Sequence, residues 1–151
     1  MSDAQEAFND LAAVARRSPG AKLVTISTID VDEDQMIRVY STDPENYPVG
    51  GRDEPLREGD DDPWYDRVVV QQRPWVSFDV DHLRENFADH ELIESLGCGA
   101  IINVPVVHEG AVIGSINLLD ADGRYDHSSV DAAVLLAARI VPVLASLDQD
   151  H

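Results

Sequence analysis

Hydrophobic residues recur along the chain at spacings that predict a helix at each end and two hairpins between them. The first helix is expected to end at Ser18-Pro19-Gly20, and Glu109-Gly110 has the composition of a tight turn. Helical spacing of apolar residues, strand-like alternation and β-branched content together define the segments. In chain order they predict a helix over residues 3–17, strands over 22–30 and 36–41, strands over 100–107 and 111–120, and a helix over 127–147.

The middle of the chain has weaker patterns. Residues 42–62 form a long polar stretch rich in proline, glycine and acidic residues, and such a loop in a compact domain is usually functional or mobile. The short elements expected after it are a helix over 63–72, a strand over 74–78 and helical turns over 81–86 and 90–96. This order predicts one α+β domain over residues 1–151, with an antiparallel sheet and a pocket within 22–120 and both terminal helices on one sheet face.

The last helix predicts an interface. Between residues 132 and 147 the only charged residue is Arg139, so apolar groups surround most of the helix. One stripe can cover the sheet, whereas the rest needs a second partner. The first helix could supply part of that cover. The alternative that we favour is a symmetric homodimer through the terminal helices.

The charge of the chain limits its partners. It has 29 acidic and 11 basic residues and a formal net charge of −18, which disfavours nucleic acid and anionic membranes. No run is expected to approach a membrane span, and the N-terminal stretch lacks the apolar core of a signal peptide. A soluble cytoplasmic protein is therefore expected. The acidic surface suits either a salty cytoplasm or plain high solubility.

Motifs for metal binding and catalysis are incomplete. The HELIE segment at residues 90–94 has Glu94 where a zinc helix needs a second histidine, and residues 30–41 lack the glycine and the last glutamate of a calcium loop. No metal site and no catalytic residue are predicted. The single cysteine, Cys98, allows no disulfide within the chain.

Several segments together resemble the GAF domain family of small-molecule sensors, which is related to PAS domains. They are IINVPV at residues 101–106, GAVIGSINL at 110–118, RVYS at 38–41 and YPVGG at 47–51. The resemblance covers about residues 4–147 and points to small bacterial or archaeal single-domain members. It implies a six-stranded antiparallel sheet with helices on one face and, on the other, a ligand pocket covered by the middle segment.

The function implied by this resemblance is sensing. Relatives bind cyclic nucleotides, bilins, haem, amino acids and other small metabolites, and the sequence does not identify the ligand or a cofactor. Without an effector domain, the chain is expected to signal through a dimer or a protein partner. One alternative is a ligand-free dimerisation or adaptor module. Another, from relatives that reduce free methionine sulfoxide, is a thiol-dependent reductase that uses Cys98 and an external thiol, although a small buried residue is the simpler role for this cysteine.

Strand alternation suggests which residues form the pocket. Ser115, Asn117 and Ile113 are expected on one face of their strand, and Thr25 and Ser27 share a face of theirs, which gives a partly polar floor. Arg38 could hold a carboxylate or phosphate, or pair with a nearby acid. The aromatic candidates could be pocket walls or core, and the asparagines could bond to ligand or backbone. The full candidate set is Thr25, Ser27, Arg38, Tyr40, Ser41, Tyr47, Trp64, Trp75, Asn103, Ser115 and Asn117.

Overall fold

A six-stranded antiparallel sheet forms the middle layer of the protein, with strand order β3-β2-β1-β6-β5-β4. The computed structural model describes residues 3–53 and 55–149. The strands are β1 (Leu23–Asp30), β2 (Gln35–Ser41), β3 (Arg52–Asp53), β4 (Trp75–Ser77), β5 (Ala100–His108) and β6 (Ala111–Asp120). The strand count and the antiparallel α+β architecture confirm the predicted fold class.

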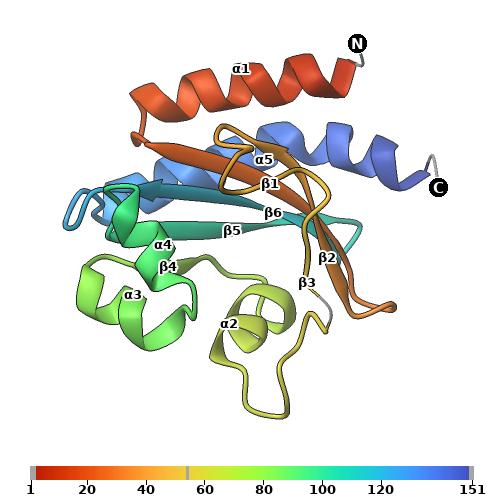
Figure 1. Cartoon of the computed structure of the whole chain (residues 1–151). Helices are drawn as coiled ribbons and strands as arrows, with labels where there is room; N and C mark the ends of the chain where they lie inside the picture. Colours follow the sequence, from red (N-terminus) through yellow and green to blue (C-terminus); the bar gives the residue numbers. More distant parts are fainter. Residues whose placement is uncertain (1–2, 54, 150–151) are drawn as a thin grey trace.

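Helices cover both faces of this sheet (Figure 1). The two long ones, α1 (Asp3–Arg17) and α5 (His127–Gln149), pack on one face. The other face is covered by four short elements, α2 (Pro63–Tyr65), the π-helix η1 (Asp66–Val70), α3 (Val80–Asn86) and α4 (His90–Ser95). The terminal helices therefore lie where the sequence predicts.

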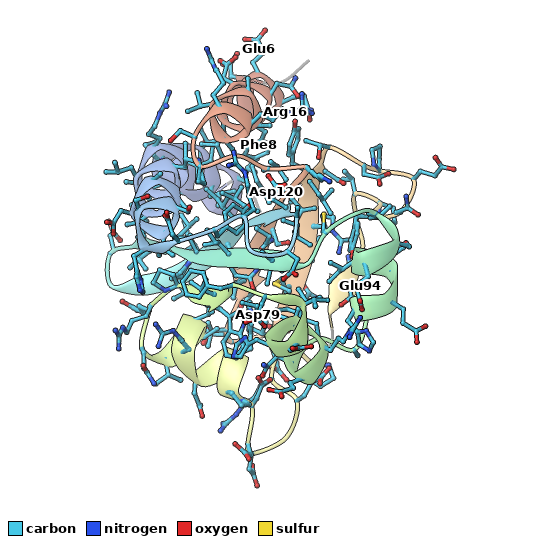
Figure 2. All side chains as sticks on the ribbon, turned by 90° about the vertical axis from the view of Figure 1, so that its left-hand side faces the viewer. Glu6, Phe8, Arg16, Asp79, Glu94 and Asp120 are labelled. Atoms are coloured by element: carbon cyan, nitrogen blue, oxygen red, sulfur yellow. The ribbon has the colours of Figure 1, made fainter. Side chains whose placement is uncertain are left out.

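The helix-side face is an apolar core. Val24 and Ile26 of β1 meet Ile116 of β6 there, and α1 and α5 contribute Phe8 and Leu136. Figure 2 shows Phe8 directed from α1 toward the sheet, whereas Glu6 of the same helix points outward. Burial of this face holds both terminal helices against the sheet, because isolated helices of such length are marginal in water.

Two β-bulges change the faces that strict alternation predicts. One lies at Ile26/Ser27, where β1 pairs with β2, and the other at Val106/Val107, where β5 pairs with β6. The second bulge places Val112 in the cluster on the opposite side from α5, and Ile113 against the helix-side core. The expectation that Ile113 shares a face with Ser115 and Asn117 is therefore wrong, because the bulge inserts one extra residue into the strand.

The middle segment also differs from expectation. The helix expected over 63–72 is one α-helical turn followed by the π-helix, and a two-residue strand, β3, lies within the stretch expected to be a loop. A pair of residues has no alternation to detect, and the hydrogen-bonding register of a helix is not encoded in its apolar spacing. Both differences are local and leave the sheet order unchanged.

The outer side of α5 is apolar and exposed. Val134 and Leu135 have 42% and 68% of their surface exposed. Among the described residues, His127–Leu147 has the length and mean hydropathy (2.0) of a segment that could cross a membrane, with 28% of the tested window buried. The expectation that no run approaches such a segment is wrong on length and composition, although core helices of soluble proteins meet the same criteria.

Candidate functional site

A cavity of about 460 Å³ lies between the sheet and the segments that cover the face opposite α5. β1, β2, β5 and β6 supply its floor, and the loop before α2, α2 itself and the turn between α3 and α4 supply its walls. The lining consists of Leu23, Thr25, Ser27, Met36, Arg38, Tyr47, Pro55, Leu56, Glu58, Asp62, Trp64, Asn86, Phe87, Ala88, Asp89, Ile93, Ile101, Asn103, Asn117 and Leu119.

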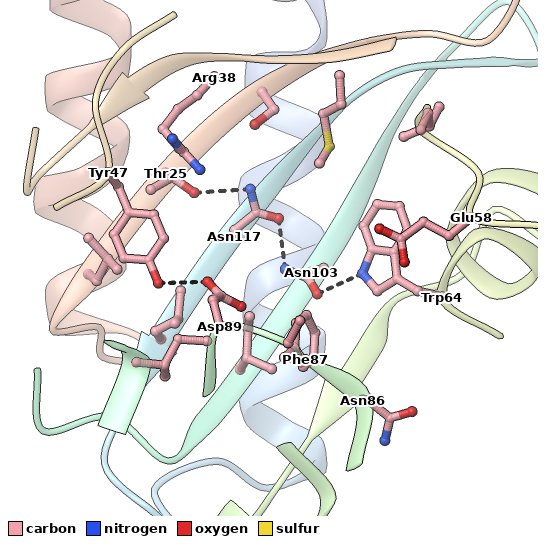
Figure 3. A pocket seen from close by; sticks show the side chains of 18 of the residues that line it. Thr25, Arg38, Tyr47, Glu58, Trp64, Asn86, Phe87, Asp89, Asn103 and Asn117 are labelled. Carbon is pink, nitrogen blue, oxygen red and sulfur yellow. Dashed lines mark hydrogen bonds between the residues drawn. The ribbon is translucent and has the colours of Figure 1, made fainter. Parts of the chain in front are cut away.

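A row of side-chain hydrogen bonds crosses the floor (Figure 3). The indole Nε1–H of Trp64 donates to Asn103 Oδ1 (3.0 Å), and Asn103 Nδ2 donates to Asn117 Oδ1 (2.8 Å). Asn117 Nδ2 then donates to the Thr25 hydroxyl oxygen (3.1 Å). Ser115 also donates to Asn117 Oδ1 (3.3 Å), from a fully buried position. The two amides are thereby held in fixed orientations, so the row offers a ligand a rigid polar surface.

One end of the cavity is built around Tyr47. Its hydroxyl donates to Asp89 Oδ2 (3.0 Å), which ties the segment after β2 to the turn before α4, 42 residues away. The guanidinium carbon of Arg38 lies 5.0 Å from the centre of the Tyr47 ring, and Arg38 Nη1 donates to the Pro48 carbonyl (3.1 Å). Burial and the negative charge of Asp89 raise the pKa of Tyr47, so its hydroxyl stays protonated and keeps this donor role.

Arg38 has hydrogen-bonding capacity to spare. Its Nε is buried and has no partner among the described residues. A guanidinium carries five N–H donors in a planar fork, which matches a carboxylate or a phosphate. Stacking on Tyr47 and the bond to Pro48 hold this fork in place before any ligand arrives.

The opposite end is acidic. Asp62 caps α2 by accepting the backbone N–H of Tyr65 (3.0 Å), and its other oxygen accepts the backbone N–H of Glu58 (3.0 Å). Glu58 and Trp64 both line the cavity, and Figure 3 shows them on the same side of it. With Asp89, three carboxylates and one cation, Arg38, line the described cavity.

This fold and cavity can now be compared with known proteins. The sequence model of the GAF domain matches residues 2–145. The chain belongs to the GAF domain family. The match spans nearly the whole chain and confirms the family resemblance of its segments. No curated protein sequence matches it.

Solved structures share the GAF fold at low sequence identity. A GAF domain/HD domain protein from Geobacter sulfurreducens is 13% identical with a TM-score of 0.75, covering 97% of this chain and 95% of that one. A domain of a two-component sensor histidine kinase from Sinorhizobium meliloti is 18% identical with a TM-score of 0.68, covering 99% and 97%. The GAF domain of the cyanobacteriochrome TePixJ is 20% identical with a TM-score of 0.70, covering 99% and 93%. At these identities the likeness establishes the fold alone.

The GAF cavity brings together seven of the residues singled out from the sequence. They come from four strands, the loop after β2 and the first turn of α2, so no local pattern joins them. The seven that line the cavity are Thr25, Ser27, Arg38, Tyr47, Trp64, Asn103 and Asn117.

Four other candidates lie outside the lining, each for a specific reason. Tyr40 pairs across from Ile26 and faces the helix side, where its ring packs against Phe8 at 5.7 Å. Ser41 uses its hydroxyl to accept the backbone N–H of Asp43 (3.0 Å). Trp75 is buried against His82 and donates to Ser77. Ser115 is fully buried, and its hydroxyl donates to Asn117. As cavity-lining positions these four expectations are wrong.

Other lining residues were missed. The turn between α3 and α4 contributes Asn86, Phe87, Ala88 and Asp89, and the loop before α2 contributes Leu56 and Glu58. The loop gave a signal, since its length predicts a functional segment. The turn between α3 and α4 has no such signal in its sequence. Asp89 is held at the cavity by its hydrogen bond to Tyr47, which lies 42 residues earlier in the chain.

Cys98 is separate from this cavity. It is 4% exposed in a hydrophobic cluster and is not part of the lining. Burial, aided by the negative charge of Asp120, raises the pKa of its thiol. A thiolate nucleophile needs the opposite environment. The GAF fold is also that of a free methionine-R-sulfoxide reductase from Neisseria meningitidis, which is 17% identical with a TM-score of 0.62, covering 99% and 84%.

Among residues 3–53 and 55–149, no group of three or more histidine, cysteine, aspartate or glutamate side chains is placed to hold a metal ion.

Proposed function

We propose that this GAF domain is a sensor that binds a small molecule in the cavity above the Trp64–Asn103–Asn117–Thr25 row. The row carries the proposal, because it holds two amides, one of them buried, in one orientation at the base of a cavity instead of an apolar floor. Aliphatic and aromatic side chains around it would exclude water, and polar groups at both ends would orient the ligand.

The signal would pass through a dimer or a protein partner. The exposed apolar side of α5 supports a homodimer through the terminal helices, since α1 covers only part of that helix. The Tyr47–Asp89 hydrogen bond joins two covering segments, so a ligand that binds one arrangement of them more tightly would shift their position. We place this activity in the cytoplasm, away from nucleic acid and membranes, on the strength of the net charge of −18.

A thermal-shift screen with matched variants tests this function. The panel holds small metabolites in four charge classes: neutral, anionic, cationic and zwitterionic. At least one class should raise the melting temperature of the wild type, because a ligand bound only to the folded state stabilises it. Thr25→Val, which removes a cavity hydroxyl, should weaken that rise. Thr28→Val is the control, since Thr28 is on the same strand outside the lining.

Two results would contradict the sensor function. If no class shifts the melting temperature, the chain is better described as a ligand-free dimerisation or adaptor module. If Thr25→Val and Thr28→Val respond alike, binding occurs elsewhere.

Reduction of methionine sulfoxide by Cys98 is the enzymatic alternative. Only the shared fold favours it, and the burial of the thiol outside the cavity opposes it. Cys98→Ala should therefore leave any turnover of methionine sulfoxide with dithiothreitol unchanged. Turnover that is present in the wild type and lost in this variant would establish the reductase instead.

A further inference from the structure

Charges in the cavity are sorted along the floor row. Arg38 is on β2, and from there the row runs through Thr25 on β1, Asn117 on β6 and Asn103 on β5 to Trp64. Figure 3 shows Arg38 at the Thr25 end and Glu58 at the Trp64 end. Adjacent strands lie about 4.8 Å apart, so the backbones of β2 and β5 are separated by roughly 14 Å. We call the Arg38 end the positive end, because it holds the cation of the lining, with Asp89 nearby, and the end with Glu58 and Asp62 the negative end.

The positive end has unused donors. The Arg38 side chain makes one hydrogen bond, to the Pro48 carbonyl, and no salt bridge with any described residue, although 29 acidic residues are present in the chain. Its buried Nε is the one buried side-chain nitrogen or oxygen without a partner in the described part of the chain. An oxygen ligand with two acceptors would satisfy this fork and remove the cost of the unpaired Nε.

The negative end has an unused acceptor. Both oxygens of Asp62 accept backbone N–H groups. The Glu58 carboxylate, in contrast, has no hydrogen-bond or ion-pair partner among residues 3–53 and 55–149. The lining holds three carboxylates and one guanidinium, so it would repel a ligand that carries only negative charge. A positive group on the same ligand would be attracted to the carboxylates and would offset this repulsion.

We propose that the ligand is a small zwitterion that binds Arg38 through a carboxylate and Glu58 through an ammonium or guanidinium group. This assignment rests on the proposed small-molecule function of the cavity. The separation of the two ends requires charges several bonds apart, which an α-amino group beside its carboxylate does not provide. The Thr25 hydroxyl, which accepts from Asn117, still has its own proton to donate to the middle of such a ligand.

Calorimetry with probes of equal chain length tests this charge pattern. The probes are 6-aminohexanoate, hexanoate, hexylamine, hexanol and 2-aminohexanoate. 6-Aminohexanoate should bind the wild type about tenfold or more tightly than each of the others, because it alone satisfies both ends at once. Arg38→Gln should remove this advantage over hexylamine, and Glu58→Gln should remove it over hexanoate. Arg139→Gln and Glu109→Gln, on surfaces outside the lining, are the charge-matched controls.

The outcomes separate this assignment from the proposed function. If a singly charged or neutral probe, or 2-aminohexanoate, binds as tightly as 6-aminohexanoate, the assignment is overturned and the small-molecule function stands. If none of these probes binds, the assignment is overturned, and the thermal-shift panel decides the function independently. If Arg38→Gln or Glu58→Gln fails to fold, the relative affinities of the five probes for the wild type are sufficient to test the assignment.

Discussion

Asn103 connects the cavity floor to its wall. Its oxygen accepts the Trp64 indole and its nitrogen donates to Asn117, and it is 4% exposed. Loss of this amide leaves the Trp64 N–H without its partner and removes one of the two donors to the Asn117 oxygen, which keeps its bond from Ser115. The GAF floor is therefore held by a side chain whose replacement has a measurable cost.

Asn103→Val should lower the free energy of unfolding by about 1–3 kcal/mol, since the Trp64 N–H is left without its partner and the Asn117 oxygen keeps only the bond from Ser115. Urea unfolding followed by circular dichroism measures this change. Asn46→Ala, at an exposed turn, is the control and should stay within about 0.5 kcal/mol of the wild type. Equal effects of the two substitutions would show that the row does not stabilise the fold.

Sequence reasoning found the floor residues better than the wall residues. Thr25, Ser27 and Asn117 follow from strand alternation, which depends only on a period of two. Tyr40 was misplaced because the face of β2 depends on a bulge in its pairing with β1, and such a bulge leaves no mark in hydrophobicity. Asp89 was missed because its contact with Tyr47 arises only when distant segments meet.

At the scale of elements, α3 and α4 are joined by one ion-pair network beside the cavity. Arg84 Nε donates to Glu94 (3.0 Å), and His90 Nδ1 lies 2.9 Å from the other oxygen of the same carboxylate. The hydrogen bond from Arg84, followed by that from His90, lowers the pKa of Glu94 from its ordinary 4.5 to about 2. This network fixes the turn that carries Phe87 and Asp89.

The Glu94 contribution to stability should depend on pH. Its folded-state pKa lies below its unfolded value, so the contribution is present above about pH 4.5 and is lost as the pH falls toward 2. Glu94→Gln should therefore be less stable than the wild type at pH 7, and the two should converge near pH 2. Urea midpoints across this range measure the difference. Glu91→Gln, on the same helix, should show no such pH dependence, and a constant gap for Glu94→Gln would contradict the account.

The elements themselves were predictable to different degrees. The terminal helices and the four long strands have enough residues for their periodicity to be read, and their bounds agree with prediction within about two residues. The π-helix at Asp66–Val70 and the strand at Arg52–Asp53 were missed, because pairing partners and hydrogen-bond register decide them.

At the scale of the whole molecule, α5 leaves an apolar side uncovered, with Val134 and Leu135 exposed. Leu135→Asp should convert a dimer into a monomer, since it places a charge on the most exposed large apolar side chain of that helix. Light scattering after size exclusion, over a range of concentrations, measures the mass. Val31→Asp, an equally apolar but distant site at the β1–β2 turn, should stay dimeric. A wild type that is monomeric at all concentrations would contradict the dimer.

The most direct test of ligand binding uses the two tryptophans of the chain. Trp64 Nε1–H bonds to Asn103 in the cavity, whereas Trp75 Nε1–H bonds to Ser77 outside it. Their indole signals in a ¹⁵N-correlated spectrum therefore give a reporter and an internal control in one sample. Titration with a compound that raises the melting temperature should move the Trp64 signal and leave that of Trp75 in place. A compound that binds by calorimetry without moving the Trp64 signal would show that this cavity is not the binding site.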